Sequence, residues 1–116
     1  MKRKTALFIG RWQPPHDGHK KLIQRVLKEN KNIIIAIRDT KLNEENPYSY
    51  KQRKAMFLKL LRNHPLVKII KIPDINEICY GRKTGYRIRE IRLAKKWEDI
   101  SGTNIRKKLN NRNQHE

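Results

Sequence analysis

Residues 10–19 read Gly-Arg-Trp-Gln-Pro-Pro-His-Asp-Gly-His, and the fold can be worked out from this stretch. The apolar run 6–9 leads into it, and the helical pattern of residues 20–29 leads out of it. The layout is therefore a strand, a turn that contains glycine and proline, and a helix. In an open α/β sheet such a junction lies at the carboxyl end of a strand, where ligands bind.

Two histidines of this stretch fall where the helix begins. His16 and His19 are three residues apart, so both lie on one face of the first helical turn. The same helix end offers unpaired backbone N–H groups and a partial positive charge, which suit a phosphate group. Gly18 lies between the histidines and leaves room for a ligand to approach the backbone. The alternative is that His16 only caps the helix while His19 packs beneath the loop.

The rest of the chain continues the alternation of strands and helices. Strands are predicted at residues 5–9, 33–37 and 66–72, and helices at residues 18–29 and after a Ser49–Gln52 capping box. This order predicts a single domain over residues 1–116, an α/β fold with a Rossmann-like parallel sheet and flanking helices. The first strand is expected to be buried on both faces because its apolar run is nearly continuous.

Two later segments and one helix face complete the structural expectations. Residues 86–93 alternate enough to form a further strand, and residues 104–110 are expected to form a last helix. The buried face of the second helix is expected to consist of apolar residues, namely Ala55, Met56, Leu58, Leu60 and Leu61.

The composition limits the classes of partner. The chain has 116 residues, with 29 Lys and Arg against 11 Asp and Glu, which gives a formal net charge of +18. Such a charge attracts nucleotides, nucleic acid or an anionic membrane. The basic residues are spread along the whole sequence, which favours general surface charge over a dedicated nucleic-acid stripe. No apolar run is as long as a membrane span, so no membrane partner is expected. Cys79 is the single cysteine, which excludes an intrachain disulfide and favours a cytoplasmic setting.

Three segments occur in an order that is more specific than any one of them. The first is residues 10–19, the second is Asn-Pro-Tyr-Ser-Tyr-Lys-Gln-Arg at residues 46–53, and the third is Ile-Ser-Gly-Thr-Asn-Ile-Arg at residues 100–106. Together they resemble the motifs of the His-x-Gly-His nucleotidyltransferase superfamily. This superfamily includes nicotinamide-mononucleotide adenylyltransferases and glycerol-phosphate-type cytidylyltransferases.

The resemblance implies a reaction and a set of catalytic residues. A nucleoside monophosphate group would pass from ATP or CTP, with ATP slightly favoured, to a small phosphorylated or acidic acceptor, and pyrophosphate would leave. His16 and His19 would contact the triphosphate, and Arg106 would add a charge-assisted hydrogen-bond fork. Mg²⁺ would accompany the triphosphate, and no metal site made of protein groups alone is expected.

The resemblance also implies binding residues. The nucleotide-binding residues would be Gly10, Arg11, Trp12, Gly18, Ser101, Gly102 and Thr103. The substrate contacts would be Asp39, Arg53 and Arg82. Three duller interpretations stay open at this stage: Trp12 fills the core, Ser101 and Thr103 are only helix caps, and Arg53 is a solvated helix residue.

The sequence departs from the family pattern in two places. Gly102 stands where the family usually has a second serine, and only residues 74–99 separate the third strand from the last motif. The acceptor site is therefore expected to be small, built by residues 75–86, or completed by another subunit, which makes a homo-oligomer plausible. The competing interpretations are a degenerate nucleotide-binding module and a non-enzymatic, basic nucleic-acid-binding protein on the same fold.

Overall fold

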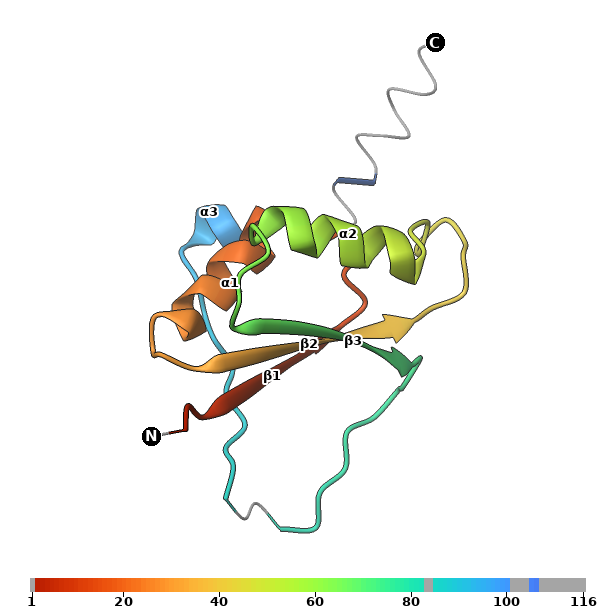
Figure 1. The fold of residues 1–116 in the computed structure, drawn as a ribbon. Helices are drawn as coiled ribbons and strands as arrows, with labels where there is room; N and C mark the ends of the chain where they lie inside the picture. The colour runs from red at the N-terminus through yellow and green to blue at the C-terminus, as the bar shows by residue number, and fades with distance from the viewer. Residues whose placement is uncertain (1, 83–84, 101–104, 107–116) are drawn as a thin grey trace.

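The computed structural model describes residues 2–82, 85–100 and 105–106. The elements follow in the order β1 (Thr5–Gly10), α1 (Asp17–Leu27), β2 (Asn32–Asp39), α2 (Tyr50–Leu60), β3 (Val67–Pro73) and α3 (Lys95–Glu98). The strands form one parallel sheet in the order β1-β2-β3, and Figure 1 shows all three helices on the same face of it. The predicted α/β fold with a parallel sheet and flanking helices is confirmed.

The core lies between the central strand and the helices. Ile33, Ile35 and Ile37 of β2 alternate along the strand and are fully buried. Ile35 pairs with Phe8 of β1 and with Ile69 of β3, so one apolar layer crosses all three strands. The helices cover this layer with buried side chains, among them Ile23, Val26, Phe57 and Leu61.

Local signals explain where the two long helices begin. The Ser49 hydroxyl accepts a hydrogen bond from the Gln52 backbone N–H at 3.1 Å, and the Gln52 side chain accepts one from the Ser49 N–H at 2.8 Å. This is the capping box predicted from the sequence. Helix α1 is amphipathic: Ile23 and Val26 are buried, while Lys21 and Arg25 are exposed.

The face of the sheet opposite the helices is only partly covered. Leu7 of β1 is 57% exposed, and Ile9 and Ile34 are half-buried. The expectation that β1 is buried on both faces was wrong, because the described helices all lie on the other face (Figure 1). Within the described part of the chain, no helix is long and apolar enough to cross a membrane.

The segment between β3 and α3 also differs from expectation. Residues 74–82 and 85–94 form an extended loop beneath the sheet that returns to α1 (Figure 1), and residues 86–93 form no strand. Side chains hold this segment: Arg89 pairs with Glu29 at 2.8 and 2.9 Å, and Arg25 donates to the Arg92 carbonyl at 2.7 Å. The short helix α3 was not predicted. Of the helix predicted at residues 104–110, only residues 105–106 are described, and they are helical.

The buried face of α2 agrees only in part with the predicted one, of which Leu61 is buried as expected. Ala55 and Leu58 are exposed, whereas Phe57 and the charged Arg53 are fully buried. Phe57 packs edge-on against the Trp12 ring, with 5.2 Å between the ring centroids. The helix is therefore rotated so that an aromatic and a guanidinium group face the sheet.

Replacing Phe57 with alanine should lower the free energy of unfolding by about 3–5 kcal/mol, because it leaves a cavity in the core. Leu58→Ala is the matched control in the same helix, since Leu58 is 39% exposed and its truncation leaves little void. Urea unfolding followed by circular dichroism measures both. Equal losses in the two variants would contradict this orientation of α2.

Candidate active site

The two histidines form a capping box at the start of α1. His16 is the N-cap, and its Nδ1 accepts hydrogen bonds from the backbone N–H of Gly18 at 3.1 Å and of His19 at 3.4 Å. In return, the His19 Nδ1 accepts from the His16 backbone N–H at 3.2 Å. The rings stack with their centroids 3.6 Å apart. Because each Nδ1 accepts a hydrogen bond, the proton of each neutral ring lies on Nε2, which can donate to a ligand.

The electrostatics favour neutral imidazoles. Burial is the larger cause, and the neighbouring His16 the smaller, that together lower the pKa of His19 to about 3. Burial also lowers the pKa of His16, while Asp17 acts in the opposite direction. Without a ligand, both rings are therefore hydrogen-bond donors at neutral pH, and neither carries the positive charge that a protonated ring would add.

Trp12 packs against this turn from the core of the protein. The indole is buried, its Nε1 donates to the Ala36 carbonyl at 3.1 Å, and its ring meets His19 edge-on with 4.7 Å between centroids. A Cβ atom at Gly10 would lie 2.8 Å from the indole, so glycine is required beneath the ring. Trp12 thus fills the core, and its predicted contact with a nucleotide base stays a prediction.

Gly18 is required for a reason other than the one expected. A Cβ atom there would lie 2.9 Å from the His16 ring and 2.9 Å from the carbonyl oxygen of Trp97 in α3. The space that was assigned to an approaching ligand is therefore occupied by the chain itself. Gly18 lets the His16 ring fold back over the first turn of α1.

Gln13 joins the turn to the loop that follows β2, and the sequence analysis did not single it out. Its side-chain Nε2 donates to the Tyr48 carbonyl at 2.9 Å and to the Thr40 hydroxyl at 3.1 Å, and its Oε1 accepts from the Tyr48 N–H at 3.0 Å. The Gln13 carbonyl accepts a hydrogen bond from the Arg106 guanidinium. One residue thus connects the three segments on which the family resemblance rests.

Arg53 ties together the ends of three elements from inside the protein. The side chain is 0% exposed. Its Nε donates to the Ser49 carbonyl at 3.1 Å, and its Nη1 donates to the carbonyls of Arg11 and Arg38, each at 2.7 Å. Its Nη2 is buried and has no hydrogen-bond partner among the residues that the structure describes. Burial lowers the pKa of Arg53, while the carboxylates of Asp39 and Asp74 oppose this shift.

The interpretation of Arg53 as a solvated helix residue is therefore wrong. The carbonyls that compensate its burial come from distant parts of the chain, so helical periodicity alone could not reveal it. Its predicted substrate contact stays a prediction.

The other predicted site residues differ in whether the structure connects them to the histidine turn. Arg11 is exposed, and its Nη1 donates to Asn46 of the second motif at 3.4 Å. Asp39 is exposed at the end of β2. Arg82 lies on the loop beneath the sheet, and within the described residues no hydrogen bond or ion pair joins it to the histidine turn. Of the third motif, residues 101–104, with the predicted Ser101, Gly102 and Thr103, lie outside the described residues.

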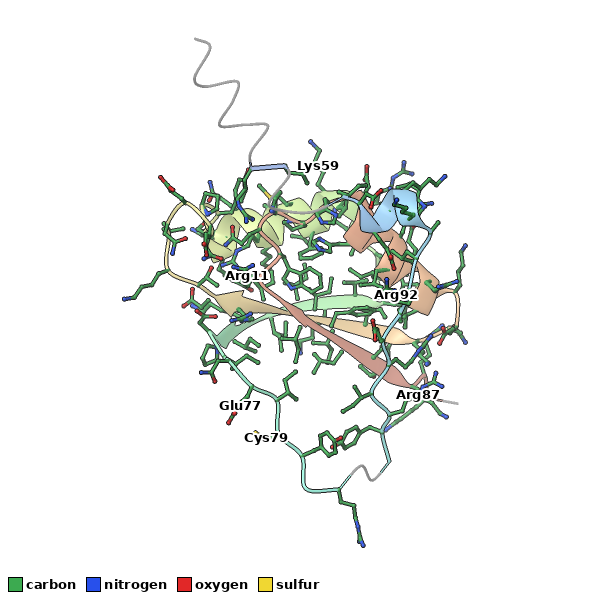
Figure 2. All side chains as sticks on the ribbon, turned by 180° about the vertical axis from the view of Figure 1, so that it is seen from behind. Arg11, Lys59, Glu77, Cys79, Arg87 and Arg92 are labelled. Atoms are coloured by element: carbon green, nitrogen blue, oxygen red, sulfur yellow. The ribbon has the colours of Figure 1, made fainter. Side chains whose placement is uncertain are left out.

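Figure 2 places the labelled Arg11 beside the helical layer, whereas Glu77 and Cys79 lie on the loop at the far side of the sheet. Cys79 is exposed, and its thiol donates to the Glu77 carboxylate, with 3.6 Å between Sγ and Oε1. The loop that carries Cys79 thus points away from the histidine turn.

Replacing Arg53 with lysine should lower the free energy of unfolding by about 2 kcal/mol or more, because one ammonium group cannot reach carbonyls on three elements and buried acceptors are left unpaired. The control is Lys54→Arg, a change at the exposed neighbouring position. Urea unfolding measures both variants. A fully stable Arg53→Lys protein would show that the three hydrogen bonds contribute little.

The low pKa of His19 should make stability depend on pH. The ring titrates at about 3 in the folded chain and at its ordinary value of 6.5 when unfolded, so the unfolded chain binds more protons between these values. Stability should therefore fall as the pH drops from 6.5 towards 3. The slope should be shallower in His19→Gln, and Lys21→Gln should keep the parent slope. Thermal melts across this pH range measure the effect, and an unchanged slope in His19→Gln would contradict the burial of the ring.

Comparison with known proteins agrees with this geometry. The sequence model of the cytidylyltransferase-like family matches residues 7–73. The nicotinamide-nucleotide adenylyltransferase of Methanococcus aeolicus is 32% identical over 91% of this chain and 77% of its own length. The enzyme of that name from Thermoplasma acidophilum is 34% identical, and that match covers 65% of this chain and only 44% of the relative.

A solved structure gives a similar result. It is a bifunctional NMN adenylyltransferase/ADP ribose pyrophosphatase from Francisella tularensis, complexed with AMP and a manganese ion. The match has a TM-score of 0.57 and 35% identity, and it covers 62% of this chain and 23% of that one. With the double-histidine turn at the carboxyl edge of a parallel sheet, these similarities lead to one assignment: the chain belongs to the cytidylyltransferase-like family of His-x-Gly-His nucleotidyltransferases.

Proposed function

We propose that this chain is an adenylyltransferase that transfers AMP from ATP to nicotinamide mononucleotide and releases pyrophosphate. The observation that carries the proposal is the double-histidine cap, which leaves two Nε2–H donors at a helix N-terminus. The names of the relatives support adenylyl over cytidylyl transfer and support nicotinamide mononucleotide as the acceptor.

In this reaction the protein mainly positions the reacting groups. A phosphate oxygen of the acceptor attacks the α-phosphorus of ATP, the bond from that phosphorus to the bridging oxygen breaks, and its electron pair leaves with pyrophosphate. The two imidazole N–H groups donate to phosphate oxygens as negative charge develops on them. Arg106, held at the Gln13 carbonyl, supplies positive charge beside the same turn.

We propose that Mg²⁺ enters with ATP and is bound chiefly by its phosphate oxygens. Among the described residues, no group of three or more His, Cys, Asp or Glu side chains is arranged to hold a metal ion. The described groups of the turn are neutral imidazoles and arginines, which suit the phosphates rather than the cation. The relative that was crystallised with AMP and manganese supports a divalent ion at such a site.

The first test is a pyrophosphate-release assay with ATP or CTP, with and without nicotinamide mononucleotide. We expect turnover with ATP that requires this acceptor, and little with CTP. Turnover with CTP and glycerol 3-phosphate instead would replace the proposed substrates. No turnover, together with no calorimetric binding of a non-hydrolysable ATP analogue, would overturn the enzymatic proposal and favour the degenerate module.

The second test separates the two roles of His19. In His19→Gln a glutamine at the third helical position can still close the capping box, but the imidazole donor is lost. We expect the fold to persist by circular dichroism and kcat to fall by about 10²–10³-fold. Lys28→Ala, a change at the exposed C-cap of the same helix, should keep the parent kcat. Full turnover of His19→Gln would exclude a catalytic role for the ring.

A further inference from the structure

The outward face of α2 is basic along its whole length. Lys51, Lys54 and Lys59 are exposed on this helix, and Arg62 is exposed just beyond its end. The helix contains no acidic residue. We call these four residues the basic ridge. Figure 2 shows the labelled Lys59 pointing away from the body of the protein.

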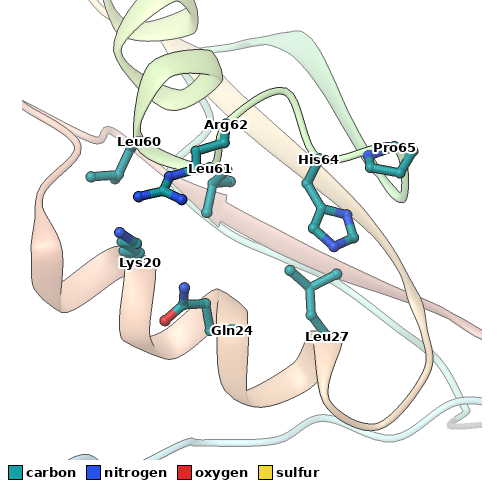
Figure 3. Close-up of a pocket in the computed structure, with 8 residues that line it drawn as sticks. All are labelled: Lys20, Gln24, Leu27, Leu60, Leu61, Arg62, His64 and Pro65. Carbon is teal, nitrogen blue, oxygen red and sulfur yellow. The ribbon is translucent and has the colours of Figure 1, made fainter.

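A groove with a volume of about 430 Å³ lies beside the basic ridge, between α1 and the end of α2. Figure 3 shows Lys20 of α1 and Arg62 facing this groove, with Gln24 and His64 further along it. None of its lining residues is acidic. Two positive charges that share a groove repel each other, and an anion bound between them relieves that repulsion.

Several acidic residues form ion pairs with basic residues outside the ridge. Glu29 pairs with Lys31 and Arg89, Asp74 pairs with Arg38, and Glu98 pairs with Arg92. Within the described residues, no ion pair involves a member of the basic ridge. The positive charges of the ridge are thus not neutralised by any ion pair that the structure describes.

We propose that the basic ridge and the adjoining groove form a docking surface for the phosphate backbone of double-stranded nucleic acid. Helix α2 has 11 residues and is therefore about 16 Å long, while a duplex carries a charge about every 1.7 Å of its axis. The ridge can therefore meet several phosphates at once. Electrostatic contacts of this kind position a protein on a duplex without reading its sequence.

The chemistry of the surface argues against two other partners. Binding of single strands relies on aromatic side chains that stack on bases, and the ridge has none. The exposed Tyr80 and Tyr86 belong to the loop between β3 and α3, which Figure 1 shows on the opposite side of the sheet. Insertion into a membrane surface needs a broad apolar face, whereas Leu58 is the only large apolar residue on α2 that is exposed.

The test compares two variants of equal formal charge. The ridge variant is Lys51→Gln, Lys54→Gln, Lys59→Gln and Arg62→Gln. The control variant is Lys2→Gln, Lys4→Gln, Lys41→Gln and Lys95→Gln, four exposed positions outside the ridge. Fluorescence anisotropy with a labelled duplex over a salt series gives the slope of log K against log salt. Relative to the parent, the ridge variant should lose about 3–4 from the magnitude of that slope, and the control variant much less.

The result is interpreted once folding has been checked by circular dichroism. If the ridge variant is unfolded, single changes at Lys54 and Lys59 replace it, and each should lower the slope by about 1. Equal losses in the ridge and control variants would overturn the proposal in favour of diffuse surface charge. Failure of the parent protein to bind the duplex, or equally tight binding to vesicles containing phosphatidylserine, would also overturn it. None of these outcomes depends on adenylyltransferase turnover.

Discussion

The hydrogen bonds of the buried Arg53 guanidinium hold together the edge of the sheet at which the histidine turn lies. A charged group withdrawn from water is costly unless hydrogen bonds replace the lost hydration. Here the carbonyls of Ser49, Arg11 and Arg38 supply them. These carbonyls lie at the cap of α2, just after β1 and near the end of β2, so the guanidinium fixes the relative positions of three segments. The loop that leads to the histidines begins at one of these segments, with Arg11.

The histidine turn shows how one set of atoms can serve both folding and chemistry. The backbone N–H groups of Gly18 and His19 need acceptors, and His16 Nδ1 satisfies them. That hydrogen bond also determines which ring nitrogen carries the proton. The interpretations of His16 as a helix cap and as a phosphate ligand are therefore compatible, because they use opposite sides of the ring. The tight packing over Gly18 and Trp12 keeps the two rings in place.

The parts of the structure that were predicted from sequence depend on local signals. The three strands, the two long helices and the Ser49–Gln52 capping box all follow from periodicity and short-range hydrogen bonding. The burial of Arg53 could not be found in this way, because its partners at Arg11 and Arg38 are 42 and 15 residues away in the sequence. The linking role of Gln13 was missed for the same reason: Tyr48 is 35 residues away. Residues 86–93 alternate like a strand, yet they are held by the Arg89–Glu29 ion pair and by a hydrogen bond from Arg25 of α1 rather than by a backbone ladder.

The two faces of helix α2 are constrained to different degrees. Its inward face is specified by Phe57 and Arg53, which pack against the core and tie the site together. Its outward face makes no described ion pair and is therefore under few structural constraints, so its composition need not be basic for the fold to form. A solvated helix face commonly mixes both signs of charge, since pairs of opposite charge four residues apart stabilise a helix. Such pairs are absent within α2 because the helix has no acidic residue. The helix is slightly less stable without them, and an anionic partner bound on that face would offset this loss.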